Sequence, residues 1–294
     1  MALVIQSSNT ATSSDVSSIT ITKPTGLAVG DLLLFIGGNY DAASVNRSHT
    51  TPSGWSVIQK QASGDYRPVA YYIVATSTEV AASNFTFAMS GVTTALSGYL
   101  ARITGQTPTS PVGVSEMDIG AAVAVTTITY TTNITPVSRE SLVFNSFAAA
   151  STSMVGSPAT VSTYVSTPTL TWTEVADLGI KNGSSDGHAF GVAYAAATPS
   201  TTITSRSATV SESLALGNSG ICLVVKGIFS TTGTNALHSV SPTQFSQAGV
   251  AGTTGTNTLH AVSPTMFAQS GKGQRGTPWT NSDKPSTNWN NLPK

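Results

Sequence analysis

Segments with the length and composition of β-strands recur along the first 228 residues of this 294-residue chain. Each segment is a short apolar run bounded by Gly, Pro, Asn or Ser, as expected for strands separated by turns. The clearest runs are residues 17–22, 31–38, 54–61, 68–76, 84–91, 98–105, 126–133, 140–150, 170–180, 189–198, 200–205 and 220–227. Strands this numerous, joined by short turns, predict a β-sandwich or a barrel.

The composition supports an all-β protein. Charged residues make up 9% of the chain, against about 25% in an ordinary soluble domain. Thr and Val favour strands, whereas Ser and Gly favour turns. Long amphipathic helices would need more Lys and Glu for their solvent-exposed face.

The strand-like segments form two series in the same order. Trp55 in the first series corresponds to Trp172 in the second. Thr76 and Gly105 lie 122 residues before Thr198 and Gly227. We therefore expect residues 1–228 to form a jelly-roll-like antiparallel sandwich with a pseudo-two-fold internal repeat. Its two similar halves are predicted at about 1–108 and 125–228. Each tryptophan is expected to plug one end of the core.

A different pattern follows Phe229. Two copies of T-T-G-T-N-x-L-H-x-V-S-P-T-x-F-x-Q-x-G, offset by 22 residues, lie within residues 229–272 and are identical at 14 of 19 positions. Residues 273–294 contain a shorter repeat, in which Trp279 and Trp289 are ten residues apart. Recurrence of side chains at fixed places is not expected of a disordered linker, although the low hydrophobicity would permit one.

We expect these repeats to form an extended tail that docks on another surface. A polar segment of this length buries too little apolar area by itself to offset the entropy of ordering it. Two equivalent peptides suggest two equivalent pockets, and linking them raises the avidity of binding. The expected docking residues are Leu237, His238, Phe245, Leu259, His260, Phe267, Trp279 and Trp289. Symmetry of this kind predicts a homo-oligomer, and intertwining around a three-fold axis predicts a trimer.

The sequence offers little for catalysis or cofactor binding. The four histidines are not spaced as zinc ligands require, and the acids are isolated along the chain. The run GKGQRG at 271–276 lacks the flanking strand and helix of a dinucleotide-binding loop. We therefore expect no enzyme activity, no metal and no cofactor. Cys222 lies in an apolar run and is expected to be buried.

Charge and hydropathy indicate the partners. Thirteen basic residues balance thirteen acidic ones and are scattered singly, so no footprint for nucleic acid or an anionic membrane is expected. No apolar run is long enough to span a membrane. The stretch MALVIQSSNTATSS does not have the pattern of a signal peptide. Synthesis in a host cytoplasm followed by exposure on a released particle would reconcile these features with the hydroxyl-rich surface.

Carbohydrate is a further candidate ligand, since exposed aromatic side chains can stack on sugar rings. Tyr40, Tyr66 and Tyr164 are in or near polar segments and are the candidate glycan contacts. A tyrosine that is merely exposed at the surface remains the alternative at each position.

Five segments together resemble a β-sandwich module of tailed-phage tail and virion surface proteins. They are PTGLAVGDLLLF, TPSGWSVI, VAYYIVATSTE, FTFAMSG and SGYLARITG, all within residues 24–105. The resemblance extends over roughly residues 1–228. The C-terminal tryptophan units resemble the Trp/Pro-rich tandem repeats that end some phage tail proteins.

This resemblance implies a non-enzymatic structural protein on the virion surface. A tail fibre or tail-associated adhesin is favoured, with the C-terminal repeats anchoring it to other virion proteins or to sister subunits. The alternatives are a capsid decoration protein, and a carbohydrate-binding module or glycan depolymerase subunit that meets host surface glycan.

Overall fold

The computed structural model describes most of the chain up to Ile228, and all of its strands belong to one compact unit, Met1–Phe229. The residues it describes are 2–41, 47–61, 66–120, 125–136, 138, 140–151, 158–182, 186–199, 201–214 and 217–228. Strands make up 71% of the structure and helix 3%. The strands pair antiparallel, and the sheets do not close into a barrel. The predicted all-β antiparallel sandwich is confirmed.

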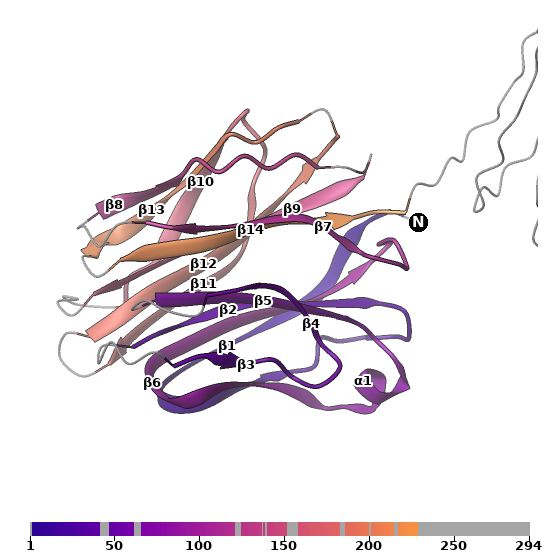
Figure 1. Ribbon diagram of the computed structural model, residues 1–294, viewed down its shortest axis with the longest axis horizontal. Coiled ribbons are helices and arrows are strands. Elements are labelled where there is room, and N and C mark those ends of the chain that lie inside the picture. The colour runs from indigo at the N-terminus through magenta and orange to yellow at the C-terminus, as the bar shows by residue number, and fades with distance from the viewer. Residues whose placement is uncertain are drawn as a thin grey trace, which may run out of the picture. The chain divides into compact units, whose positions relative to one another are not determined.

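The described residues form fourteen strands and one short helix, labelled in chain order in Figure 1. The first half of the chain contains β1 (Val4–Thr22), β2 (Leu32–Tyr40), β3 (His49–Thr50), β4 (Ser56–Lys60), β5 (Tyr66–Val74), α1 (Ser77–Ala81) and β6 (Asn84–Thr104). The second half contains β7 (Val112–Ile119), β8 (Val125–Tyr130), β9 (Ser141–Ser151), β10 (Val161–Thr167), β11 (Thr173–Asn182), β12 (Asp186–Ala197), β13 (Ser205–Leu214) and β14 (Asn218–Lys226).

The first half folds its sheet over on itself. β1 and β6 pair from Val4 to Thr22, with register shifts between Ile5 and Ser7 and between Val16 and Ser18. The first part of β1 and the last part of β6 join β2, β5 and β4 in a five-stranded layer. Their remaining parts and β3 form a second, smaller layer. Ile21 and Phe87 of the smaller layer pack on Phe35 of the larger one in a shared core.

The second half repeats this arrangement with separate strands. Its larger sheet has the order β11-β12-β9-β14-β7, and its smaller sheet has the order β10-β13-β8. Reading the first half as β4-β5-β2-β6-β1 gives the same order strand for strand. β3 and the bent parts of β6 and β1 likewise correspond to β10, β13 and β8. The predicted internal repeat is therefore present, and its second set of strands begins with β7 at Val112.

The two larger sheets pack face to face, so the body has four layers (Figure 1). β1 lies against β11 and β4 lies against β7, while β6 meets β12 and β5 meets β14. These contacts exchange with one another when the halves are interchanged, which is what a pseudo-two-fold axis requires. Amide side chains link each stacked edge: Gln59 Nε2 donates to the Ser115 carbonyl at 3.1 Å, and Asn182 Nδ2 donates to Asp15 at 2.9 Å.

The central strands of the larger sheets do not alternate between buried and exposed residues. Every residue of β2 and of β9 is buried, because both faces of these strands are covered. Leu34 of β2 faces the other half, whereas its neighbour Phe35 faces the small layer of its own half. Phe35 stacks on Phe87 with ring centroids 3.6 Å apart. A strand buried on both faces loses the alternation of polar and apolar residues.

The two tryptophans occupy corresponding positions at the cores of the two halves. Trp55 is partly buried and meets Phe85 and Phe87 edge to face, with centroids 5.9 and 5.3 Å away. Trp172 is also partly buried, and its Nε1 donates to Ser166 Oγ at 3.1 Å. Each indole therefore covers one side of a core, as its place before a strand predicts.

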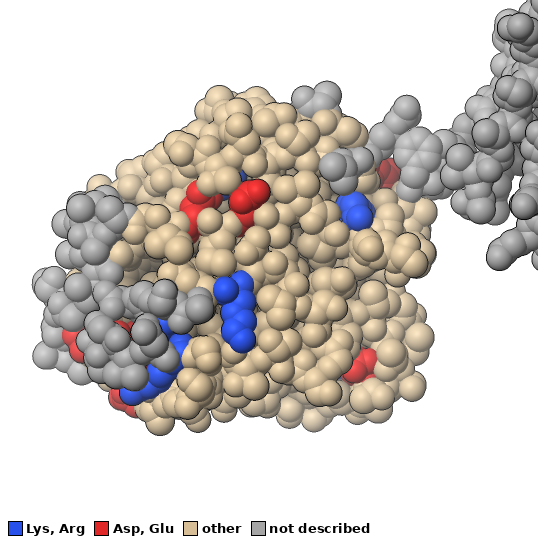
Figure 2. Space-filling view, in the orientation of Figure 1, with Lys and Arg blue, Asp and Glu red and all other residues tan. Residues whose placement is uncertain are grey.

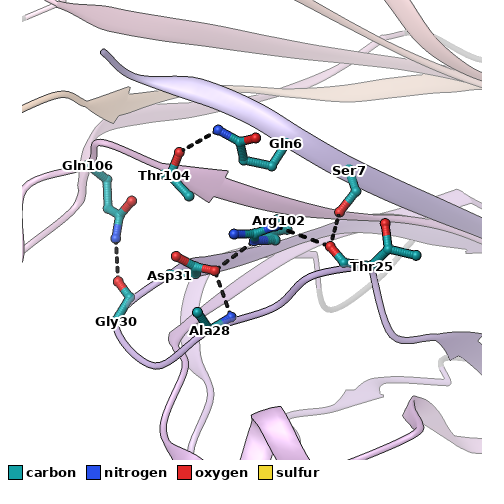
Figure 3. A network of polar contacts seen from close by, with 9 residues as sticks. All are labelled: Gln6, Ser7, Thr25, Ala28, Gly30, Asp31, Arg102, Thr104 and Gln106. Carbon is teal, nitrogen blue, oxygen red and sulfur yellow. Dashed lines mark hydrogen bonds and ion pairs between the residues drawn. The ribbon is translucent and has the colours of Figure 1, made fainter. Parts of the chain in front are cut away.

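The turn that leads into β2 is fixed by an ion pair (Figure 3). Asp31 Oδ2 accepts from Arg102 Nε at 2.6 Å and from the Ala28 backbone amide at 2.8 Å. Gly26 has φ +70°, and a Cβ there would lie 2.7 Å from Arg102 Nη1. Glycine therefore serves both the backbone conformation and the close approach of the guanidinium. This network holds the turn against β6 and aligns the start of the central strand.

Candidate functional site

The predicted docking residues of the tail fall outside the described residues. They are Leu237, His238, Phe245, Leu259, His260, Phe267, Trp279 and Trp289. Their role remains a prediction from the repeated sequence.

Two of the predicted glycan contacts are not at the surface. Tyr40 is 0% exposed and Tyr66 is 4% exposed, so neither can stack on a sugar ring. The two residues pair across β2 and β5 and contribute to the core between the halves. The expectation failed because the packed interface extends to the ends of these strands, where the neighbouring polar residues suggest a loop.

Tyr66 lies at the interface between the two halves and contacts His188, the residue at the equivalent position of the other half. His188 follows it by the repeat distance of 122 residues, and the two rings touch with centroids 5.9 Å apart. His188 Nε2 and Ser97 Oγ share a hydrogen bond of 2.7 Å, and Ser97 Oγ is 2.9 Å from Thr12 Oγ1. The pseudo-two-fold axis therefore passes close to Tyr66 and His188, which have equivalent positions in the two halves but different side chains.

Burial determines the protonation of the two described histidines. Both His188 and Ser97 are 0% exposed, and desolvation lowers the pKa of His188 to about 3. Desolvation likewise lowers the pKa of His49 to about 4, with smaller contributions from the nearby charges of Lys60 and Arg67. The Ser97–His188 pair has the geometry of a nucleophile and base. Its complete burial makes it instead a neutral link between the two halves.

A partly exposed cluster in the second half is the better candidate for a binding site. Asp177 Oδ1 on β11 accepts from the Val161 amide of β10 at 2.9 Å. Burial raises the pKa of Glu174, and the neighbouring Asp177 carboxylate raises it further. Burial also raises the pKa of Asp177. We call Glu174, Asp177 and Tyr164 the acidic cluster.

Tyr164 joins the cluster from β10. Desolvation raises the pKa of its phenol, and the charges of Glu174 and Asp177 add to the effect. Its ring lies 5.7 Å from that of Phe147, and its hydroxyl occupies the space that a side chain at Gly191 would need. Of the three predicted glycan contacts, Tyr164 alone keeps partial exposure. Here two carboxylates and an aromatic side chain lie together.

A β-bulge brings the two acids together. The register of β11 shifts between Glu174 and Ala176, and such a bulge redirects the side chains that follow it. Residues 174 and 177 would otherwise point to opposite faces of a strand. The sequence shows these acids three residues apart in TEVAD but contains no signal for the bulge, so they were expected to be isolated.

The cluster can act as a hydrogen-bond acceptor. Partly desolvated carboxylates accept well from hydroxyl groups, and a raised pKa is also the property of a general acid. The arrangement therefore suits a neutral, hydroxyl-bearing ligand better than an anion.

A second charged cluster of the second half is structural. The guanidinium of Arg206 on β13 is fully buried and pairs with Asp118 of β7. Asp118 also accepts from the Thr132 hydroxyl, and Arg206 Nη1 donates to the Thr132 carbonyl at 2.7 Å. This network ties together the large and the small sheet. Cys222 is buried as expected, and desolvation raises the pKa of its thiol to about 12.

Acid should destabilise the fold through His188. Below pH 6.5 an unfolded histidine binds a proton that the buried ring does not bind until about pH 3, so stability is lost as the pH falls. His188→Gln retains a hydrogen-bonding partner for Ser97 without titrating. Its free energy of unfolding should depend less steeply on pH between 6 and 4, by up to about 1.4 kcal/mol per pH unit. Denaturant titrations at four pH values measure this slope. Tyr66→Phe, the control at the equivalent position, should leave the slope unchanged, and an unchanged slope in His188→Gln would refute the assignment.

The acidic cluster predicts a coupled titration. Asp177→Asn removes the charge that helps to raise the pKa of Glu174, so this pKa should fall while the effect of burial remains. A carbon-detected NMR titration of the glutamate carboxyl groups measures it. Glu79→Gln on α1, in the other half, is the control and should leave Glu174 as it was. A pKa of Glu174 that stays the same or rises in Asp177→Asn would show that the two carboxylates are not coupled.

Further observations concern metals, membranes and relatives. Among the residues that the structure describes, no group of three or more His, Cys, Asp or Glu side chains is placed to hold a metal ion. Within the same residues, no helix has the length and apolarity needed to cross a membrane. Comparisons with protein-family models, curated proteins and solved structures give no match to this chain.

Proposed function

We propose that this chain is a non-enzymatic structural protein on the surface of a tailed-phage virion, and that its C-terminal repeats anchor it to the particle or to sister subunits. A tail fibre or tail-associated adhesin remains the favoured form, and a capsid decoration protein remains the alternative within this class.

The observation that carries the proposal is that the first and the last strand of the body have their outer ends on the same side. The start of β1 and the end of β14 lie at one end (Figure 1), where Ile228 N donates to the Gly105 carbonyl at 2.8 Å. The ends of β2 and β9 lie at the opposite end, close to the Tyr66–His188 contact. A rigid body that begins and ends at one pole suits a protein that is fastened there and presents its other pole.

The surface chemistry supports the same proposal. Figure 2 shows charged side chains only singly or in small groups on a face that is otherwise uncharged. Hydroxyl groups supply the polarity instead, as the composition predicts. Such a surface is common in proteins that work outside cells, and the sequence resemblance points to the same setting.

Glycan contact is a second candidate function, favoured by the acidic cluster. Tyr164, Glu174 and Asp177 combine a half-buried tyrosine, whose hydroxyl is buried, with carboxylate acceptors for hydroxyl groups. This is the chemistry expected of a carbohydrate-binding module, and the raised pKa of a carboxyl is also compatible with a depolymerase subunit. An adhesin could use the acidic cluster to contact glycan, so this second function is compatible with the first.

Removal of residues 230–294 tests the anchoring proposal. If the repeats fasten the protein, the truncated chain should fold but should no longer be retained on the particle. Phe245→Ala and Phe267→Ala should each weaken retention, and the double variant should weaken it by about 100-fold or more, because linked sites act through avidity. Particle occupancy after washing, measured by quantitative mass spectrometry, gives the result.

Gln244→Ala is the matched control, because position 244 differs from its counterpart Met266 and lies outside the shared pattern. It should leave retention unchanged. Full occupancy by the truncated chain would disprove anchoring through the repeats.

A further inference from the structure

The outer edge of β1 is the least protected long edge among the described strands. β1 is the end strand of the large sheet in the first half and pairs there with β6 alone. From Ser7 opposite Arg102 to Ser14 opposite Ala95, the pairing advances one residue at a time without a break. We infer that this edge, Ser7–Ser14, is a homotypic interface that pairs antiparallel with the same edge of a second copy of the chain.

The edge carries no charge. No Asp, Glu, Lys or Arg occurs between Val4 and Ser14, and the first charged residue is Asp15, which has φ 53° where the strand bends. Backbone amides and carbonyls at the edge of a sheet attract another strand, and natural proteins normally block such edges with charges, bulges or short strands. The nearest register shift lies before this segment, between Ile5 and Ser7, and the pairing from Ser7 to Ser14 contains neither a bulge nor a charge.

The other edges of the two large sheets are blocked. β7, the counterpart of β1 in the second half, has only eight residues and carries Glu116, while its Asp118 pairs with the buried Arg206. β11 has a bulge and carries Glu174, Asp177 and Lys181. β4 has only five residues, a bulge and a lysine. The edges of β1 and β7 therefore have equivalent places in their sheets but carry different side chains. Of these two described edges, that of β1 is the one open to pairing with another strand.

The edge strands of the small sheets have shorter uninterrupted segments for pairing with another strand. β10 has a register shift between Ser162 and Val165, and Thr163 has φ 54°. β8 has six residues, and its pairing with β13 is interrupted between Thr209 and Leu214. Neither gives an uninterrupted edge as long as Ser7–Ser14.

The occupant that fits this edge is the same strand of another molecule. In an antiparallel contact with two-fold symmetry, a residue near the middle of the strand lies beside its own copy, so charges there would repel each other. Self-pairing of β7 would bring the Glu116 side chains of two copies into one short contact, whereas β1 would place Ser, Thr, Asn and Ala side chains together. Thr10, Thr12 and Ser14 are exposed and are suited to cross-strand packing. Two copies would then share one ten-stranded central sheet.

This pairing concerns the body and does not depend on where the C-terminal tail binds. It predicts two copies per assembly, whereas the tail repeats led us to expect three. The dimer and the anchoring role can therefore fail separately.

The oligomeric state of the full-length chain tests the interface. Sedimentation equilibrium of residues 1–294 should give a dimer, and Thr10→Lys should raise the dissociation constant at least 10-fold by placing two like charges across the pair. Thr12→Lys, another exposed change near the middle of the edge, should act in the same way and serves as the second variant. Thr173→Lys, an exposed change on the already charged edge of β11, is the matched control and should leave the dimer intact. Circular dichroism confirms that each variant is folded.

Hydrogen exchange distinguishes the alternative occupants. In the dimer, the amides of residues 7–14 that point away from β6 should exchange slowly, and Thr10→Lys should release them. A monomer at all concentrations, a trimer, or a dimer unaffected by both lysine variants would overturn the inference. A monomer in which these amides are protected would overturn it too, and would indicate that another segment of the chain covers the edge.

Discussion

The structure depends on one contact, the face-to-face packing of the two five-stranded sheets. Each of these sheets has a small layer on its outer side and the other half on its inner side. The strands at the centre, such as β2 and β9, therefore have no solvent-facing side, and every one of their residues is buried. Separating the halves would expose both inner faces to water, at a cost proportional to their apolar area. Neither half therefore has the character of an independent domain.

The interface between the two halves also contains buried polar groups. A buried polar group is costly unless it is hydrogen-bonded, and Ser97 Oγ and His188 Nε2 share a hydrogen bond across the interface. At the symmetry-related positions the chain has Ser219 and Tyr66. The duplicated halves have thus kept their strand order while their side chains diverged. The same divergence left β1 uncharged and gave β7 two acids, so a nearly symmetric body presents unequal edges.

Much of the fold could be predicted from the sequence, because strand-length apolar runs occur in two series of the same order, and two of the matches share an offset of 122 residues. The four layers could not, since an apolar strand does not reveal which partner covers each face. Tyr40 and Tyr66 were misplaced for this reason: polar neighbours suggested a loop where the packed interface continues. The acidic cluster was missed because it depends on a bulge in β11. Only Tyr164 of that cluster was singled out. The role of the tail repeats stays a prediction, because they lie outside the described residues.

Native-state hydrogen exchange tests most directly whether the two halves form one structure through their shared interface. Phe35→Ala should weaken the first half by about 3–5 kcal/mol, because a fully buried ring is removed from its core. If the interface couples the halves, the most protected amides of β9, in the second half, should lose as much protection as those of β2, because both open in the same cooperative unit. Loss of protection in β2 with none in β9 would show that the halves unfold independently and would contradict the account.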